Sequence, residues 1–129
     1  MPPTRISAII CTHNREDYLG AAIDSLLEQD FADYEVIVVD NASTDSTRAI
    51  VEARLPHPQL QYVYEANLGL SVARNAGAAV AKGEILAYLD DDAEASGGWL
   101  TALAQIYELD TTVAIAGGKV TLIWPPDCN

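Results

Sequence analysis

Residues 84–92 read Glu-Ile-Leu-Ala-Tyr-Leu-Asp-Asp-Asp, a short apolar run that passes directly into three consecutive aspartates. A run of this length and composition predicts a buried strand over residues 84–89. Adjacent carboxylates repel one another and raise one another's pKa unless a positive group lies among them. The stretch therefore predicts a strand whose carboxyl end carries a charged, oxygen-rich turn.

Strands and helices alternate along the rest of the chain. Apolar runs predict the other strands, and apolar residues three or four positions apart predict the helices. Ser43 and Thr44 are expected to cap the second helix. The alternation predicts βαβ units, and therefore an α/β fold with a mostly parallel sheet covered on both faces. The expected strands are 6–11, 34–39, 61–64, 113–116 and 119–124, and the expected helices are 18–27, about 45–55, 71–82 and 99–107.

Polar residues follow three of the predicted strands, at Thr12–Arg15, at Asp40–Asn41 and at Asp90–Asp92. In open α/β sheets, ligands bind beyond the carboxyl ends of the strands. Oxygen-only ligands suit Mg²⁺ and Mn²⁺, which often bind through one or two carboxylates plus substrate phosphates. We therefore expect a divalent cation at the aspartates, although a solvated acidic turn is the simpler alternative. Asp40 is placed to accept a hydrogen bond from an imide N–H, as uracil offers.

A glycine turn and a helix with a basic residue make up residues 67–77, which include Asn67, Gly69 and Arg74. Arg74 is one of seven basic residues, and it is a candidate partner for a phosphate or an aspartate. A surface salt bridge is the alternative. Neither a G-x-x-x-x-G-K-[ST] phosphate loop nor a G-x-G-x-x-G dinucleotide motif occurs in the sequence.

Bulk composition narrows the class of protein. The 129 residues, half of them hydrophobic, are the size of one domain, which we assign to residues 1–129. No secretory leader and no apolar run of about 20 residues is visible, which favours a cytoplasmic protein without a transmembrane segment. The formal net charge of −12 argues against nucleic-acid binding. It would also repel an anionic diphosphate unless a bound cation intervened.

Together these segments resemble the family 2 glycosyltransferases, which have the A-type nucleotide-sugar fold. The resemblance runs from residue 6 to about 120. A lone Asp-x-Asp would be weak support, but four motifs in the same order are specific. The matching segments are Ile9–Arg15 for the opening strand and Thr-x-Asn-Arg loop, Val38–Asp45 for Val-Val-Asp-Asp/Asn-x-Ser-x-Asp, Asn67–Gly77 for Asn-x-Gly-x-x-x-Ala-Arg-Asn-x-Gly, and Asp90–Asp92 for Asp-x-Asp.

This resemblance implies a three-layer α/β/α sandwich, Rossmann-like in its sheet, that binds a nucleotide-sugar donor. It implies Mn²⁺ or Mg²⁺ on Asp92, with Asp91 on the ribose or phosphate side and Asp90 sharing these roles. A UDP-sugar is favoured by analogy at Asp40 alone. The activity implied is sugar transfer with inversion, in which the metal neutralises charge on the departing nucleoside diphosphate. The other implied donor-binding residues are Thr12, Asn14, Arg15, Asp40, Asn41, Asn67, Gly69 and Arg74.

The chain departs from the family in one respect, since it lacks a match to the catalytic base. Members of the family are longer, and their catalytic base, usually an aspartate, lies in a later half with the acceptor site. No residue here matches that base, so we expect it beyond Asn129 and expect this chain to bind donor without efficient transfer. The acceptor, whether sugar, lipid or protein, and the oligomeric state stay open. The full-length protein would work in the cytoplasm or at the inner face of a membrane.

Three alternatives remain. The chain could be a donor-binding module without catalysis. A sugar-phosphate nucleotidyltransferase has a related sheet, but it carries a glycine-rich basic loop after the first strand, where Thr12–Arg15 contains no glycine. A phosphorylated receiver domain would need acidic residues after that strand, and it is the weakest of the three.

Overall fold

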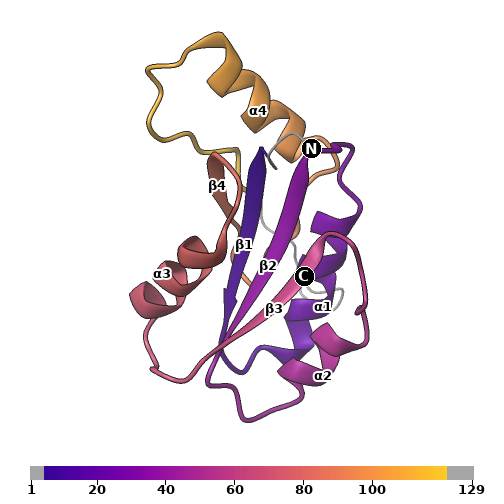
Figure 1. Cartoon of the computed structure of the whole chain (residues 1–129). Helices are drawn as coiled ribbons and strands as arrows, with labels where there is room; N and C mark the ends of the chain where they lie inside the picture. Colours follow the sequence, from indigo (N-terminus) through magenta and orange to yellow (C-terminus); the bar gives the residue numbers. More distant parts are fainter. Residues whose placement is uncertain (1–4, 122–129) are drawn as a thin grey trace.

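A computed structural model describes residues 5–121, in which four strands alternate with four helices (Figure 1). The observed strands and helices lie close to the expected positions as far as residue 109. No helix among the described residues is long and apolar enough to span a membrane. In chain order the elements are β1 (Ile6–Thr12), α1 (Glu16–Leu27), β2 (Tyr34–Asn41), α2 (Thr47–Glu52), β3 (Leu60–Glu65), α3 (Leu70–Val80), β4 (Ile85–Tyr88) and α4 (Trp99–Leu109).

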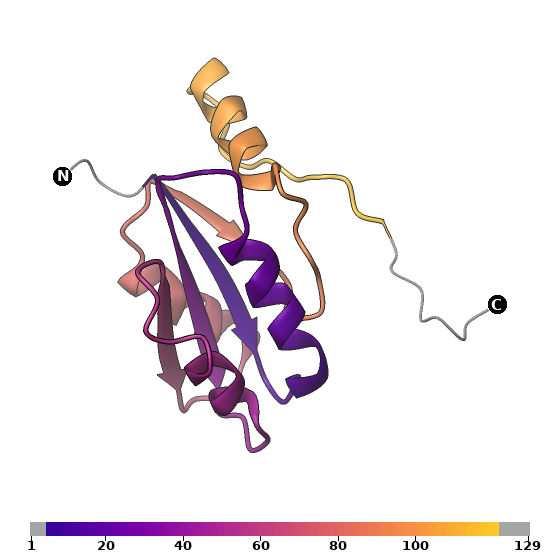
Figure 2. The ribbon, with the colours of Figure 1, turned by 90° about the vertical axis from the view of Figure 1, so that its right-hand side faces the viewer.

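The strands form one parallel sheet in the order β3-β2-β1-β4. Ile6 at the start of β1 lies opposite Tyr34 of β2 and Ile85 of β4, and Thr12 at its end lies opposite Asp40. All four carboxyl ends therefore point to one end of the sheet, as the arrowheads in Figure 2 show. The loops that follow the strands meet there, which is where the sequence placed its polar segments.

Alternate residues of the central strands face opposite sides of the sheet, as a pleated strand requires. Ile6, Ala8 and Ile10 pack into a core cluster that includes residues of α1, α2 and α4. Ile9 faces the other way and packs with Ala73 of α3. Figure 1 shows α3 on one face of the sheet and α1 and α2 on the other. The predicted three-layer α/β/α arrangement with a parallel sheet is confirmed.

Helix α3 approaches the sheet closely because Gly77 has no side chain. A Cβ at Gly77 would lie 2.7 Å from Cγ2 of Ile9 and 3.1 Å from Cγ2 of Val39. Both are branched side chains on buried strands, so neither can move aside easily. The glycine thus fixes the depth at which α3 lies on β1 and β2, and with it the position of the helix start.

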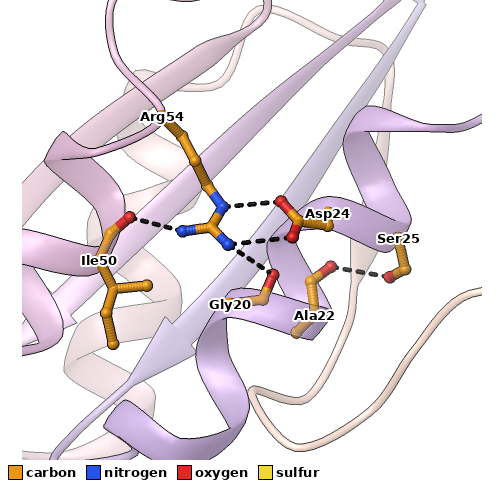
Figure 3. Close-up of polar contacts among 6 residues, drawn as sticks. All are labelled: Gly20, Ala22, Asp24, Ser25, Ile50 and Arg54. Carbon is orange, nitrogen blue, oxygen red and sulfur yellow. Dashed lines mark hydrogen bonds and ion pairs between the residues drawn. The ribbon is translucent and has the colours of Figure 1, made fainter.

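An arginine ties α1 to the end of α2 (Figure 3). The Arg54 guanidinium donates to both carboxylate oxygens of Asp24, at 2.7 and 3.0 Å, and to the carbonyl of Ile50 at 2.8 Å. The hydrogen bond from Arg54 lowers the pKa of Asp24 below its usual value. This paired contact holds the two helices that cover the same face of the sheet.

Helix α2 is shorter than the sequence predicts, and its start differs. It begins at Thr47, after Ser46, instead of after Ser43 or Thr44. The Asp45 carboxylate accepts the Thr47 N–H at 2.9 Å, which is the role expected of a residue before a helix. The predicted caps were wrong because Ser43 and Thr44 instead bond to Asn14, a residue far away in sequence.

The prediction of two strands after α4 was also wrong for the residues that the structure describes. Residues 113–116 and the described part of 119–124, residues 119–121, have no strand structure; residues 122–124 lie outside the described range. Within residues 5–121, none of this segment pairs with a strand of the sheet. Apolar composition alone does not make a strand when no neighbouring backbone completes its hydrogen bonds.

Candidate functional site

A pocket of about 470 Å³ opens at the carboxyl ends of the strands. It lies between the loops after β1 and β4, the end of β2 and the first turn of α3. Of the predicted site residues, those that line it are Thr12, Arg15, Asn41, Gly69, Asp90, Asp91 and Asp92. The pocket thus brings together residues from all four of the motifs that the sequence singled out, with Asn41 coming from the second.

Four predicted residues do not line the pocket: Asn14, Asp40, Asn67 and Arg74. Three of them, Asn14, Asp40 and Asn67, instead take part in hydrogen bonds that hold the loops after the strands. The lining also includes residues that were not predicted, which are Cys11, His13, Leu68, Leu70 and Ala73. Each of these directly adjoins a predicted residue or lies one helical turn away, so their place follows from the same strand-end rule.

Asn41 fixes the loop between β3 and α3. Its side-chain Oδ1 accepts the N–H of Gly69 at 2.9 Å, and its Nδ2 donates to the carbonyls of Glu65 and Asn67 at 3.1 and 2.9 Å. Gly69 has a φ of 152°, a backbone conformation that favours glycine. The amide side chain therefore sets the position of the loop and of the helix start that follows it.

Asp40 is buried at the end of β2, with 2% of its surface exposed. Its Oδ1 accepts the backbone N–H of Ser43 at 3.1 Å, and its Oδ2 accepts the hydroxyl of Tyr62 at 2.6 Å. Burial, and then the neighbouring Asp40, raise the pKa of Tyr62 above its usual value. Both carboxylate oxygens thus organise the protein, and a contact between Asp40 and a base stays a prediction.

Asn14 clasps the loop after β1 to the loop after β2. Its Oδ1 accepts the N–H groups of Thr44 and Asp45, at 2.8 and 3.3 Å, and its own N–H donates to Oγ of Ser43 at 3.0 Å. These bonds hold Asn14 at a φ of 51°, a value that asparagine tolerates better than most residues. Arg15 follows directly, so its backbone position is fixed by the clasp.

His13 faces the carbonyl of Asn41, with its Nδ1 2.7 Å from that oxygen. Because a carbonyl only accepts, Nδ1 carries the proton in this contact. Sequence reasoning found no partner that would assign a role to this histidine, because its contact with Asn41 at the end of β2 joins residues that are 28 positions apart in the chain.

Asp91 is the most enclosed charge in the pocket, with 15% of its side chain exposed. Burial raises its pKa, and so do Asp92 and Asp90. The nearby Thr12 hydroxyl and the Arg15 guanidinium act in the opposite direction. Nε of Arg15 lies 3.9 Å from Oδ1 of Asp91. The carboxylate is therefore partly but not fully compensated by the protein.

Thr12 has spare hydrogen-bonding capacity at the same place. Its Oγ1 is buried, and it lies beside Asp91 without the geometry of a hydrogen bond to any described residue. Its place in the pocket lining marks a position at which a bound group could satisfy it.

Arg74 lies beside the pocket on α3 and packs against β4. Its guanidinium carbon lies 5.9 Å from the centre of the Tyr88 ring, and the Tyr88 hydroxyl donates to the Arg74 carbonyl at 3.2 Å. Tyr88 thus holds both the backbone and the head group of this arginine. A contact with a diphosphate would require the side chain to turn toward the pocket.

The carboxylate oxygens in the pocket suit a hard divalent cation that takes its remaining ligands from phosphate groups and water. Three carboxylates line one pocket, but within residues 5–121 no three His, Cys, Asp or Glu side chains converge closely enough to hold a metal by themselves. Mg²⁺ and Mn²⁺ commonly use one or two carboxylates and complete their shells with phosphate oxygens and water. The residues present fit that mode of binding.

Comparison with known proteins gives the family. The family model described as glycosyl transferase family 2 matches residues 7–121. The chain is 33% identical over 114 residues to an uncharacterized glycosyltransferase of Nostoc, covering 86% of this chain and 35% of the relative. It is 36% identical over 104 residues to the GalNAc(5)-diNAcBac-PP-undecaprenol beta-1,3-glucosyltransferase of Campylobacter jejuni, covering 78% and 34%.

Two solved structures share the fold. TarS of S. aureus in complex with UDP-GlcNAc matches with a TM-score of 0.73 and 31% identity, over 81% of this chain and 31% of that one. The mannosyltransferase PcManGT of Pyrobaculum calidifontis, in complex with GDP-Man and Mn²⁺, matches with a TM-score of 0.75 and 33% identity, over 88% and 34%. The chain spans about a third of the length of these proteins. It belongs to glycosyl transferase family 2.

Proposed function

We propose that residues 1–129 form the donor-binding domain of an inverting glycosyltransferase. The chain would bind a nucleoside-diphosphate sugar in the pocket at the carboxyl ends of the strands, with a divalent cation between the protein and the diphosphate. The observation that carries this proposal is that Asp90, Asp91 and Asp92 line one pocket together with Thr12, whose buried hydroxyl has no hydrogen-bond partner among residues 5–121.

The charge of the protein supports a cation at this place. With a net charge of −12 and three aspartates in the pocket, a bare diphosphate would be repelled. We assign Asp92 and Asp90 as metal ligands and Asp91 to the ribose or phosphate side. When bound, Mn²⁺ or Mg²⁺ would act as a Lewis acid that neutralises charge on the leaving diphosphate. The complex of PcManGT with GDP-Man and Mn²⁺ supports the use of such an ion.

The remaining residues would place the nucleoside and the phosphates. Thr12 offers its hydroxyl, and Asn41 holds the loop of Asn67 and Gly69 against the same pocket. The free N–H groups in the first turn of α3 favour negative charge at the helix start. Asp40 and Asn14 would act on the base through the loops that they fix, and Arg74 would turn from Tyr88 toward the diphosphate.

A UDP-sugar is the donor that we favour, and TarS in complex with UDP-GlcNAc supports it. The complex of PcManGT with GDP-Man makes a guanine nucleotide the specific alternative. Calorimetric titration of UDP, GDP and dTDP, each with and without Mn²⁺, tests base and metal together. We expect binding that requires Mn²⁺ and is tightest for UDP. Equal binding of all three without metal would refute the proposed site.

No residue of this chain is assigned as the catalytic base, and the acceptor is unassigned. We therefore propose that the chain binds donor but does not transfer sugar efficiently, while the full-length protein does, in the cytoplasm or at the inner face of a membrane. Incubating the purified chain with a radiolabelled UDP-sugar and candidate acceptors tests this point. Turnover comparable to that of an intact family member would contradict it.

A further inference from the structure

One basic residue faces the three aspartates of the pocket. Of the seven lysines and arginines in the chain, only Arg15 lines it. Nε of Arg15 lies 3.9 Å from Oδ1 of Asp91, the most enclosed of the three carboxylates. Arg74 lies nearby, but its guanidinium packs on the Tyr88 ring. Arg15 is therefore the one positively charged side chain among the described residues that compensates this wall of the pocket directly.

The backbone of Arg15 is held by hydrogen bonds, whereas its head group is half-exposed and makes only one long contact. Its carbonyl accepts the N–H groups of Tyr18 and Leu19, each at 3.0 Å, as expected of the residue that directly precedes α1. The preceding Asn14 is clasped to the loop after β2. Its side chain is nevertheless 49% exposed, and its contact with Asp91 is a single, long one. A guanidinium held in this way can exchange the Asp91 carboxylate for another anion without disturbing the fold.

A divalent cation held by Asp90 and Asp92 would lie close to the Arg15–Asp91 pair, because the three carboxylates line one pocket. A bare cation at that place would be repelled by the guanidinium at short range. A cation that arrives with a diphosphate changes the balance, because the phosphate oxygens offer the guanidinium a new partner with better geometry than its long contact with Asp91. Arg15 thus weakens binding of the bare cation and strengthens binding of the cation–diphosphate complex.

We infer that Arg15 couples metal binding to donor binding: it is the internal counter-ion of Asp91 in the donor-free protein, and it passes to the diphosphate when the cation and nucleotide enter together. This inference rests on the proposed function. Its consequence is that the pocket discriminates against a free divalent cation and accepts the cation–diphosphate complex. A salt bridge that only stabilised the loop would not have this consequence.

The test is to measure two affinities in the same variants. Binding of bare Mn²⁺ is followed by the electron paramagnetic resonance signal of the free ion, and binding of UDP at saturating Mn²⁺ by calorimetry. The variants are Arg15→Met, Arg15→Gln and the charge-preserving Arg15→Lys. Arg48→Met is the matched control, since Arg48 pairs with Glu52 on exposed α2. Thermal melts of each variant check that the fold is intact.

We expect the neutral Arg15 variants to gain affinity for bare Mn²⁺ and to lose affinity for UDP. Arg15→Met and Arg15→Gln should bind bare Mn²⁺ about threefold to fivefold more tightly, the size expected for loss of a partly exposed charge pair. The same variants should bind UDP at saturating Mn²⁺ about tenfold more weakly, because a charge-assisted contact to phosphate is lost. Arg15→Lys should bind bare Mn²⁺ as the wild type does, and Arg48→Met should match the wild type in both measurements.

Two kinds of failure can be told apart. If the neutral Arg15 variants bind bare Mn²⁺ no better than the wild type, the coupling is refuted, even where Mn²⁺-dependent binding of UDP persists. If the wild-type protein itself binds UDP equally well with and without Mn²⁺, the proposed function is refuted first. A variant that binds both ligands more weakly would show that Arg15 only supports the loop.

Discussion

Removing one hydroxyl group tests how firmly the end of β2 is held. Tyr62 donates to the buried Asp40 carboxylate at 2.6 Å, and Asp40 in turn holds the N–H of Ser43. Replacing Tyr62 with phenylalanine keeps the ring under the Arg48 guanidinium, which lies 5.4 Å from the ring centre. Only the hydrogen bond is lost, so the substitution isolates its contribution.

The expected loss follows from the burial of the acceptor. A hydrogen bond to a charged group contributes about 1.5–3 kcal/mol, and Asp40 has no solvent to replace it because it is 2% exposed. We expect Tyr62→Phe to lower the free energy of unfolding by about 2 kcal/mol and the melting temperature by roughly 8 °C. Tyr64→Phe is the matched control, since Tyr64 lies two residues along the same strand and is 54% exposed.

The pH dependence supplies an independent check. Burial raises the pKa of Tyr62 in the folded protein, so above about pH 10 the unfolded chain loses a proton that the folded chain retains. Deprotonation then favours the unfolded chain, and stability falls as the pH rises. Urea denaturation between pH 8 and pH 11 should show a smaller fall for Tyr62→Phe. The argument fails if both tyrosine variants unfold within about 0.5 kcal/mol of the wild type at pH 8.

Three other substitutions probe separate parts of the account. Gly77→Ala should lower the free energy of unfolding, measured by urea denaturation, by about 1–2 kcal/mol. Overpacking against Ile9 should outweigh the gain in helix propensity of about 1 kcal/mol. Gly97→Ala is the control, since a Cβ there meets open space and should leave the free energy of unfolding nearly unchanged. Arg54→Met should remove the partner that lowers the pKa of Asp24. The stability that this pair contributes is fully present above the unfolded pKa of about 4 and is lost as the pH falls through the lower pKa of the folded protein. Thermal melts of the variant should therefore depend less on pH between 5 and 3, and an unchanged dependence would count against the pair. Asn41→Asp should weaken UDP binding by about tenfold, because a carboxylate oxygen would face the carbonyls of Glu65 and Asn67; wild-type affinity would show that this loop does not order the site.

The arrangement of strands and early helices could be predicted because each depends on local pattern. Residues 34–39 and 84–89 are apolar runs of strand length, and the period of 18–27 is helical. The start of α2 could not be predicted in the same way. Ser43 and Thr44 are good caps in isolation, yet in the fold they bond to Asn14, about 30 residues earlier. A tertiary contact thus outweighed a local preference.

The location of the pocket was predictable, but the part that each residue plays in it was not. The strand-end rule placed Thr12, Asn41 and the aspartates together, and the pocket confirms that they meet. The same rule says nothing about where a side chain turns. Asp40 does not line the pocket, and its carboxylate accepts the hydroxyl of Tyr62, which the pairing of β2 with β3 brings within hydrogen-bonding distance. Such a contact depends on strand register, which no local pattern specifies.

The central claim is that a divalent ion joins the aspartates to a diphosphate. Titrating UDP into the wild-type protein and into Asp92→Ala, at zero and at saturating Mn²⁺, tests it most directly, with Glu94→Gln as a control on an exposed acid two residues away. We expect the wild type and the control to require Mn²⁺, and Asp92→Ala to lose at least about tenfold in affinity at saturating Mn²⁺. Unchanged affinity together with an unchanged Mn²⁺ requirement in Asp92→Ala would contradict the account.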